Sequence, residues 1–259
     1  MPKFSANLSM LFTELTFFER FGAAAVSGFR AVEYVSPYEN PAEKIADLLQ
    51  QHDLQQVLFN LPAGDWALGE RGIACLPDRT GEFQDGVGKA IAYAKMLNTP
   101  IVNCLAGIKP ENVSHEAAFA ALVDNLKFAD VELRRAGIQL VIEPINYYDM
   151  PGYFLNTSRE GVAVLDAVDG GAKLQYDVYH MQRMEGDLAL NLERLMPRIG
   201  HIQIAGNPGR TEPDRGETNY DFILPLIDQL GYRGWIGAEY RPVAGTVEGL
   251  AWLKKWNNT

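Results

Sequence analysis

QLVIEPIN, residues 139–146, is the stretch that decides the fold. It is a short run of strand-forming apolar residues that carries one carboxylate, Glu143. The residues just before it, RRAG at 134–137, are typical of a helix end, because glycine readily adopts the left-handed backbone found there. A strand buried on both faces of a parallel sheet reads as such an apolar run and needs a helical crossover to its neighbour. The stretch therefore predicts one repeat of an α/β protein.

The same pattern recurs along the whole chain. Eight strand-like runs are separated by segments whose apolar residues are spaced three and four apart, as in helices. The predicted strands lie near residues 3–9, 31–35, 55–61, 100–106, 139–146, 173–180, 199–205 and 235–241. Eight repeats in 259 residues predict an α/β fold, a (β/α)8 TIM barrel formed as a single domain over residues 1–259. An open doubly wound sheet is the alternative, but it calls for a glycine-rich phosphate turn after the first strand, and ANLSMLF has none.

Local signals place some of the helix boundaries. Thr157, followed three residues later by Glu160, has the pattern of a capping box. Gly28 and Gly137 stand where helix-ending glycines belong. These residues predict one helix start and two helix ends.

Composition narrows the classes of partner. The chain has 33 acidic residues against 23 Lys and Arg, a net charge of -10, which disfavours binding to nucleic acid or to an anionic membrane. Cys75 and Cys104 are the only cysteines and are too few for a disulfide scaffold. Neither a signal peptide nor a long apolar span is visible. We therefore expect a cytoplasmic protein with two reduced thiols.

Four polar residues stand inside the last four apolar runs. A buried carboxylate is costly to desolvate without a partner, so matching positions in successive repeats suggest one shared partner. Oxygen ligands indicate a hard divalent cation. Any one of these residues could simply cap a loop, but three adjacent carboxylates without a cation would repel one another. The four candidates are Glu143, Asp177, Gln203 and Glu239.

Other polar residues are expected at the same end of the barrel, where TIM-barrel active sites lie. His201 alternates with Gln203 and can point to the same face. The long segment 61–80, rich in Gly and Pro, is either a lid or a surface excursion without a role, and it carries Trp66. At comparable places in the first four strands stand Asn7, Glu33, Asn60 and Asn103.

A substrate carboxylate would need cationic partners, and arginine suits it because its guanidinium binds carboxylates in a bidentate manner. Each candidate arginine has the alternative of being a solvated loop charge. The histidine among the candidates lies three residues after Asp177, a spacing that favours it. The candidates are Arg71, His180, Arg183, Arg210 and Arg215.

The chain resembles the hydroxypyruvate isomerase family, a branch of the xylose-isomerase-like group of metal-dependent (β/α)8 barrels. The resemblance rests on several motifs in order and spans nearly the whole chain. These motifs are FSANLSMLF, NLPAGDWALGERGIACLP, IEPIN, QYDVYHMQRMEG, HIQIAGNP with EPDRGETNYD, and GWIGAEYRP.

The resemblance implies roles for the candidate residues. Glu143, Asp177, Gln203 and Glu239 would bind the metal, and Glu143 and Glu239 would also form the acid/base pair. The wider group often has a histidine where this chain has Gln203, and the change favours Mg²⁺, or else Mn²⁺, over zinc. By the same resemblance His180 would bind the substrate. Together with candidates chosen from the residues themselves, the expected substrate-binding set is His180, Arg71, Glu70, Asn60 and Arg215.

The implied reaction is the interconversion of hydroxypyruvate and tartronate semialdehyde by metal-assisted proton transfer through an enediol. A 2-oxo-tetronate isomerase or a ketose epimerase could use the same groups, and so the small keto acid stays open. An endonuclease IV type nuclease would need a histidine-rich zinc site and a basic groove. A non-catalytic ligand-binding barrel is the remaining alternative. Barrels of this group often pair, which makes a homo-oligomer compatible with the resemblance.

Overall fold

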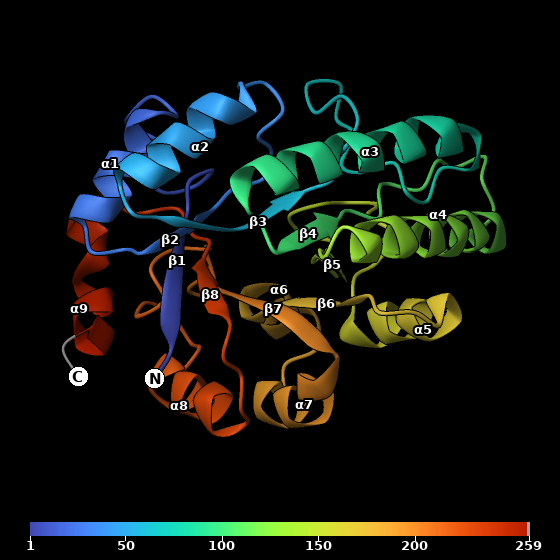
Figure 1. Ribbon diagram of the computed structural model, residues 1–259. Coiled ribbons are helices and arrows are strands. Elements are labelled where there is room, and N and C mark those ends of the chain that lie inside the picture. Colours follow the sequence, from blue (N-terminus) through green and yellow to red (C-terminus); the bar gives the residue numbers. More distant parts are fainter. Residues whose placement is uncertain (258–259) are drawn as a thin grey trace.

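Eight parallel strands close into a barrel in chain order in the computed structural model, which describes residues 1–257 (Figure 1). The open doubly wound sheet is therefore excluded, and the predicted TIM barrel is confirmed. All eight predicted strands are present, and each ends earlier than expected. The strands are β1 (Lys3–Asn7), β2 (Ala31–Glu33), β3 (Gln55–Asn60), β4 (Ile101–Cys104), β5 (Gln139–Ile142), β6 (Lys173–Asp177), β7 (Ile199–Ile204) and β8 (Trp235–Ala238).

Helices surround the strands on the outside of the barrel (Figure 1). The α-helices are α1 (Glu19–Val26), α2 (Ala42–Gln51), α3 (Thr80–Leu97), α4 (His115–Arg135), α5 (Ser158–Val168), α6 (Val178–Met184), α7 (Leu188–Leu195), α8 (Tyr220–Gln229) and α9 (Ala251–Asn257). Three 3-10 turns complete the described elements: η1 (Pro77–Arg79), η2 (Met196–Arg198) and η3 (Glu248–Leu250).

The predicted helix boundaries are confirmed. Thr157 caps α5 by accepting a hydrogen bond from the backbone of Glu160, whose side chain bonds back to Thr157. Gly28 and Gly137 follow α1 and α4 with left-handed backbones (φ 96° and 77°). The end of the sixth strand was predicted too late: His180, placed in that run, lies in α6, because Asp177 ends β6 and its side chain caps the helix.

The core has two parts of different chemistry. The part between the strands and the helices is apolar. For example, Phe4 of β1 packs edge-to-face on Trp252 of α9, with 5.0 Å between the ring centroids. Several side chains inside the barrel are instead polar and buried, and hydrogen bonds compensate their desolvation. These inner residues include Ser5, Glu33, Gln175, His201 and Gln203.

Strand register brings polar residues side by side at the carboxyl ends of the strands. Asp177 of β6 lies opposite Gln203 of β7, and Gln203 lies opposite Gly237 of β8. Because the barrel closes between β1 and β8, the first and last strands face the same interior. Sequence positions more than 200 residues apart therefore share one end of the barrel.

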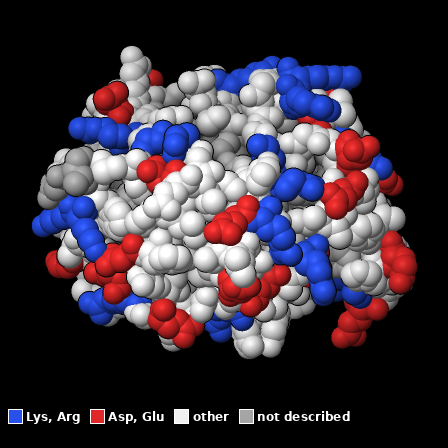
Figure 2. Space-filling view, turned by 90° about the horizontal axis from the view of Figure 1, so that it is seen from below, with Lys and Arg blue, Asp and Glu red and all other residues white. Residues whose placement is uncertain are grey.

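The outer surface carries interspersed charges of both signs on the face seen in Figure 2, without one continuous basic patch. This distribution fits the net charge of -10. Among the described helices, none combines the length and the apolar character needed to cross a membrane.

Candidate active site at the carboxyl ends of the strands

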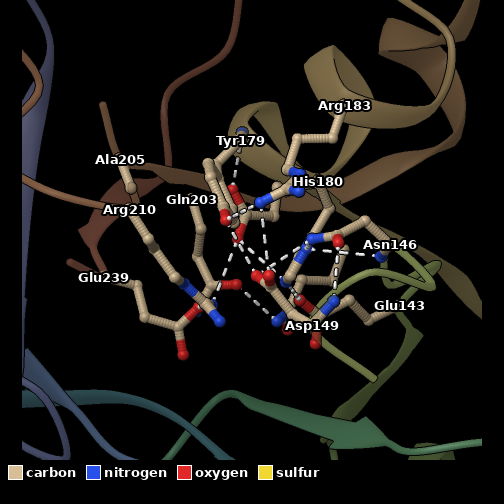
Figure 3. Close-up of polar contacts among 12 residues, drawn as sticks. Glu143, Asn146, Asp149, Tyr179, His180, Arg183, Gln203, Ala205, Arg210 and Glu239 are labelled. Carbon is tan, nitrogen blue, oxygen red and sulfur yellow. Dashed lines mark hydrogen bonds and ion pairs between the residues drawn. The ribbon is translucent and has the colours of Figure 1, made fainter. Parts of the chain in front are cut away.

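Three buried carboxylates gather at this end of the barrel, and Figure 3 labels two of them, Glu143 and Glu239. Glu143 directly follows β5 and Glu239 directly follows β8, while Asp177 is the last residue of β6. Parallel strands end at the same rim, and so their terminal side chains converge. Glu143 and Glu239 line a cavity of about 470 Å³ that opens at this rim.

Arg210, in the loop between β7 and α8, lies among these carboxylates. One of its terminal nitrogens is 2.6 Å from Glu239 Oε2 and 3.5 Å from Asp177 Oδ2. Its backbone is left-handed (φ 54°), a conformation that costs free energy for a residue with a Cβ and is often found at functional sites. Arg210 is the cation that the structure brings to the site from this loop.

Arg215, the arginine of the same loop in the expected substrate-binding set, is not brought to the cavity. Its side chain is 61% exposed, and its Nε lies 3.5 Å from a carboxylate oxygen of Glu212. Sequence reasoning considered Arg210 as an alternative but had no means to decide between them. The only available signal was that Arg210 is nearer to the end of β7.

The electrostatics of the cluster favour a further cation. Burial and the charges of Glu239 and Asp177 raise the pKa of Glu143 well above its usual value. Burial likewise raises the pKa of Asp177 to about 6 and that of Glu239 to about 7, although Arg210 acts in the opposite direction on both. One guanidinium facing three carboxylates leaves two negative charges uncompensated when all three are ionised.

The donor set fits a divalent metal ion. Asp177 Oδ2 is buried and accepts no hydrogen bond from the described residues. Single carboxylate oxygens of Glu143 and Asp177 lie within 4.8 Å of each other. Carboxylate oxygens suit a hard cation such as Mg²⁺ or Mn²⁺. Its charge of +2 would balance the two negative charges that Arg210 leaves uncompensated.

The Nε2 atom of His180 carries a proton and lies next to the carboxylates of this cluster. Its Nδ1 is 2.6 Å from the side-chain nitrogen of Asn146, whose amide orientation is fixed because its oxygen accepts from the backbone of Asp149. An Nδ1 that accepts leaves the proton on Nε2. Nε2 lies 3.5 Å from Asp177 Oδ2 and 3.8 Å from Glu143 Oε1.

The protonation of His180 agrees with this tautomer. Burial, with the nearby charges of Arg210 and Arg183, holds its pKa well below the usual value. The ring is therefore neutral, and its Nε2–H is a hydrogen-bond donor rather than a metal ligand.

Gln203 lies beside the carboxylates but is held by other side chains. Its Nε2 donates to Glu33 at 2.7 Å, and its Oε1 accepts from Gln175 at 2.6 Å. The carboxylates of the expected metal set converge, whereas the amide oxygen of Gln203 is engaged by Gln175. The second lone pair of that oxygen has no hydrogen bond among the described residues.

Asparagines from the first half of the chain contact both glutamates. Asn7 donates to Glu239 at 3.1 Å, and Asn103 donates to Glu143 at 3.2 Å. Asn103 also donates to Asn60, which lines the cavity. These amides fix the orientation of the two carboxylates.

The loop after β3 forms one wall of the cavity. Trp66 and Arg71 line it, and the guanidinium carbon of Arg71 lies 3.9 Å from the centre of the Trp66 ring. Arg71 donates through one nitrogen to the carbonyls of Trp66 and Glu70. Both bonds use the same nitrogen, and so the other edge of its guanidinium is left for a ligand.

Glu70 has a different place from Arg71. Its carboxylate accepts from Arg79 and from the backbone of Asp65, at 2.5 Å in the second case. It lies outside the cavity lining and holds the loop in shape. Of the expected substrate-binding set, the structure therefore brings Asn60, Arg71 and His180 to the cavity, and not Glu70 or Arg215.

A second group of cavity-lining residues, Asp149, Tyr179 and Arg183, was largely missed by sequence reasoning. Tyr179 donates to Asp149 at 2.8 Å, and Arg183 donates to Tyr179 at 2.9 Å and contacts Asp149 at 3.3 Å (Figure 3). Arg183 was a candidate, but Asp149 and Tyr179 were not. Both residues follow the end of a strand in the sequence. Many residues that do not line the cavity have the same kind of position, so the sequence did not single these two out.

Comparisons with known proteins agree with this architecture. A family model described as "Xylose isomerase-like TIM barrel" matches residues 21–256. The chain is 48% identical to a hydroxypyruvate isomerase of Escherichia coli, covering 98% of each chain, and 48% identical to a 2-oxo-tetronate isomerase of Cupriavidus necator, covering 99% of each.

Solved structures show the same fold. A protein from Brucella melitensis described as an AP endonuclease of family 2 superposes with a TM-score of 0.97 at 42% identity, covering 99% of each chain. A 3-keto-D-glucoside 4-epimerase from E. coli superposes with a TM-score of 0.82 at 17% identity, covering 98% of this chain and 99% of the other. At that identity the second likeness concerns the fold alone.

Proposed function

The chain belongs to the xylose isomerase-like TIM barrel family and is an isomerase, and from this premise we propose that it interconverts hydroxypyruvate and tartronate semialdehyde. One observation carries the proposal. Two buried glutamates, Glu143 and Glu239, reach the same cavity from β5 and β8 with raised pKa values. An aldose–ketose isomerisation needs two such groups, because one carbon loses a proton and its neighbour gains one.

The two glutamates would move the protons. In the forward direction one carboxylate removes a proton from C3 of hydroxypyruvate, giving an enediol that is shared by C2 and C3. A carboxyl group returns a proton to C2, and the hydroxyl proton passes from the C3 oxygen to the C2 oxygen. The amides of Asn103 and Asn7 hold the two glutamates in place for these transfers.

The remaining groups would bind and polarise the substrate. A divalent cation held by Glu143, Asp177, Gln203 and Glu239 supplies Lewis-acid stabilisation of the negative charge that develops on the substrate oxygens. The Nε2–H of His180 can donate to one of those oxygens. The guanidinium edge of Arg71 suits the substrate carboxylate.

A 2-oxo-tetronate isomerase is the second candidate function. The relative from C. necator with this name is as similar to the chain as the hydroxypyruvate isomerase is. The cavity of about 470 Å³ leaves room for one more carbon with its hydroxyl. The same glutamates serve both reactions, and the substrate therefore has to be decided by measurement.

Other classes fit less well. The nuclease alternative requires several histidines at the metal site, but His180 is the one histidine grouped with the carboxylates in the described part of the chain. A non-catalytic binding barrel gives no reason for two proton-transfer groups with raised pKa values in one cavity. A ketose epimerase would need the same groups and is tested together with the isomerases.

The experiment is an assay in D₂O with protein loaded with Mn²⁺ or Mg²⁺. The substrates are hydroxypyruvate, a 2-oxo-tetronate and two ketoses, and deuterium incorporation is followed by NMR. We expect exchange and product with a keto acid, and loss of both in Glu143→Gln. Turnover of a ketose without turnover of either keto acid would reject the proposal.

A further inference from the structure

A fourth buried carboxylate, Glu33, lies inside the barrel next to the candidate metal site. It is the last residue of β2 and has no solvent exposure. Four side chains from two other strands, β1 and β7, contact or donate to it. These are Ser5 Oγ at 2.8 Å, Asn7 Nδ2 at 3.3 Å, His201 Nε2 at 3.0 Å and Gln203 Nε2 at 2.7 Å.

The surrounding backbone is shaped for this carboxylate. On β8 the residue facing Glu33 is Gly237, and a Cβ there would overlap Glu33 Oε1. Any other residue at 237 would occupy the space of the carboxylate. The barrel therefore provides both the space and the hydrogen-bond donors that the Glu33 carboxylate needs.

Glu33 distinguishes the two ends of the Gln203 amide. An ionised carboxylate only accepts hydrogen bonds, and so it must face the NH₂ end of the amide. The carbonyl end then points the other way, where Gln175 donates to it. Without an obligatory acceptor at 33, the two ends of the amide are nearly equal in shape and could exchange.

Asn7 is oriented by the same carboxylate. Its NH₂ group donates to Glu33 and to Glu239, and its oxygen accepts from the backbone of Ser9. Glu33 is thus one hydrogen bond from Gln203 and, through Asn7, two from Glu239. Both are residues of the candidate metal site.

We propose that Glu33 is the positioning residue that makes Gln203 present its carbonyl oxygen, rather than its NH₂ group, to a divalent cation. The inference rests on the proposed metal site. Metal-binding histidines commonly donate their second N–H to a carboxylate that fixes the ring. Here the carboxylate does the same for an amide, whose wrong end would repel the cation.

The test measures Mn²⁺ affinity by titration calorimetry and by the EPR signal of free Mn²⁺, independently of turnover. Glu33→Gln should weaken binding about 10- to 100-fold, the usual effect of losing a residue that orients a metal ligand. The exchanged pair Glu33→Gln with Gln203→Glu keeps size and net charge. In this pair the new amide at position 33 donates and position 203 offers oxygens only, which should restore most of the affinity.

Two matched controls distinguish the loss of Gln203 orientation from a general loss of protein stability. Asp130→Asn neutralises a buried carboxylate outside the site that accepts from the backbone of Gly171 at 3.0 Å. Ser5→Ala removes one donor from Glu33 and leaves its bond to Gln203. Both should lower the melting temperature without changing Mn²⁺ affinity.

The outcomes are distinct. If the wild-type protein does not bind Mn²⁺, the proposed metal site fails. If it binds and Glu33→Gln binds equally well, or if Ser5→Ala weakens binding as much, Glu33 has only a structural role. Should Glu33→Gln not fold, the exchanged pair decides alone: a folded pair without Mn²⁺ binding, or a pair that also does not fold, overturns the inference.

Discussion

The contribution of Glu239 to the stability of the metal-free protein should fall as the pH rises. Burial raises the pKa of its carboxyl from 4.5 to about 7, with the charges of Asp177 and Glu33 adding to the rise and Arg210 opposing it. Between these two values the native protein retains a proton that the unfolded chain has released. The contribution to stability is complete below pH 4.5 and is lost as the pH passes 7.

The magnitude follows from the two pKa values. Raising the pH from 5 to 8 should lower the free energy of unfolding by about 2–3 kcal/mol through this one group. His180 acts in the opposite sense, because its pKa is lowered and it disfavours the native state in acid. The absolute pH profile therefore mixes several groups, and a difference between two variants is the quantity to measure.

Urea unfolding of the wild type and of Glu239→Gln, both freed of metal, supplies this difference. Glutamine resembles the protonated carboxyl and does not titrate. The wild type should therefore lose about 2–3 kcal/mol relative to the variant between pH 5 and pH 8. Mn²⁺ binds the ionised form, and it should stabilise the wild type more at pH 8 than at pH 5.

Two results would refute the reasoning. Parallel pH profiles of wild type and variant would mean that Glu239 titrates normally in the native protein. A wild type that gains stability relative to the variant as the pH rises would mean that Arg210 outweighs burial. Asp166→Asn, at a largely exposed carboxylate, is the control and should leave the profile unchanged.

Further predictions concern catalysis and packing. Glu143→Gln should lower kcat at least about 100-fold with an unchanged circular dichroism spectrum, because a proton-transfer group is lost; near-normal turnover would exclude it from that role. Arg71→Ala should raise KM for the keto acid about 10- to 100-fold, as loss of a charged hydrogen bond predicts, whereas Arg233→Ala, at an arginine with 72% side-chain exposure, should not; equal KM values would remove Arg71 from the substrate site. Gly237→Ala should lower the free energy of unfolding by about 2 kcal/mol or more, because its Cβ overlaps Glu33; a wild-type urea midpoint would contradict the close contact. Removal of divalent ions with a chelator should abolish turnover, and Mn²⁺ or Mg²⁺ should restore it; full activity in the chelator would exclude a metal role.

The fold was predictable because its signals are local. Each strand is an apolar run, and each helix shows regular spacing, so the barrel followed from eight repeats. The strand ends were less certain: Glu143 and Glu239 lie just beyond β5 and β8, and His180 lies in a helix. An apolar pattern does not reveal where pairing stops, because buried residues continue into the loop.

The site was predictable where it lies on strands and not where it lies on loops. The carboxylates Glu143, Asp177 and Glu239 converge because parallel strands end together. The choice between Arg210 and Arg215 depended on the path of the β7–α8 loop, which no periodicity encodes. The orientation of Gln203 depended on Glu33, which is 170 residues away in the chain and contacts it only after the barrel closes.

The order of the strands has a consequence for biosynthesis. Glu239 follows β8, and β8 must pair with β1, which is synthesised more than 200 residues earlier, before the barrel closes. A growing chain therefore cannot bring Glu239 beside Glu143 and Asp177 until β8 has been translated. A ligand that contacts all three carboxylates would therefore stabilise only the closed barrel.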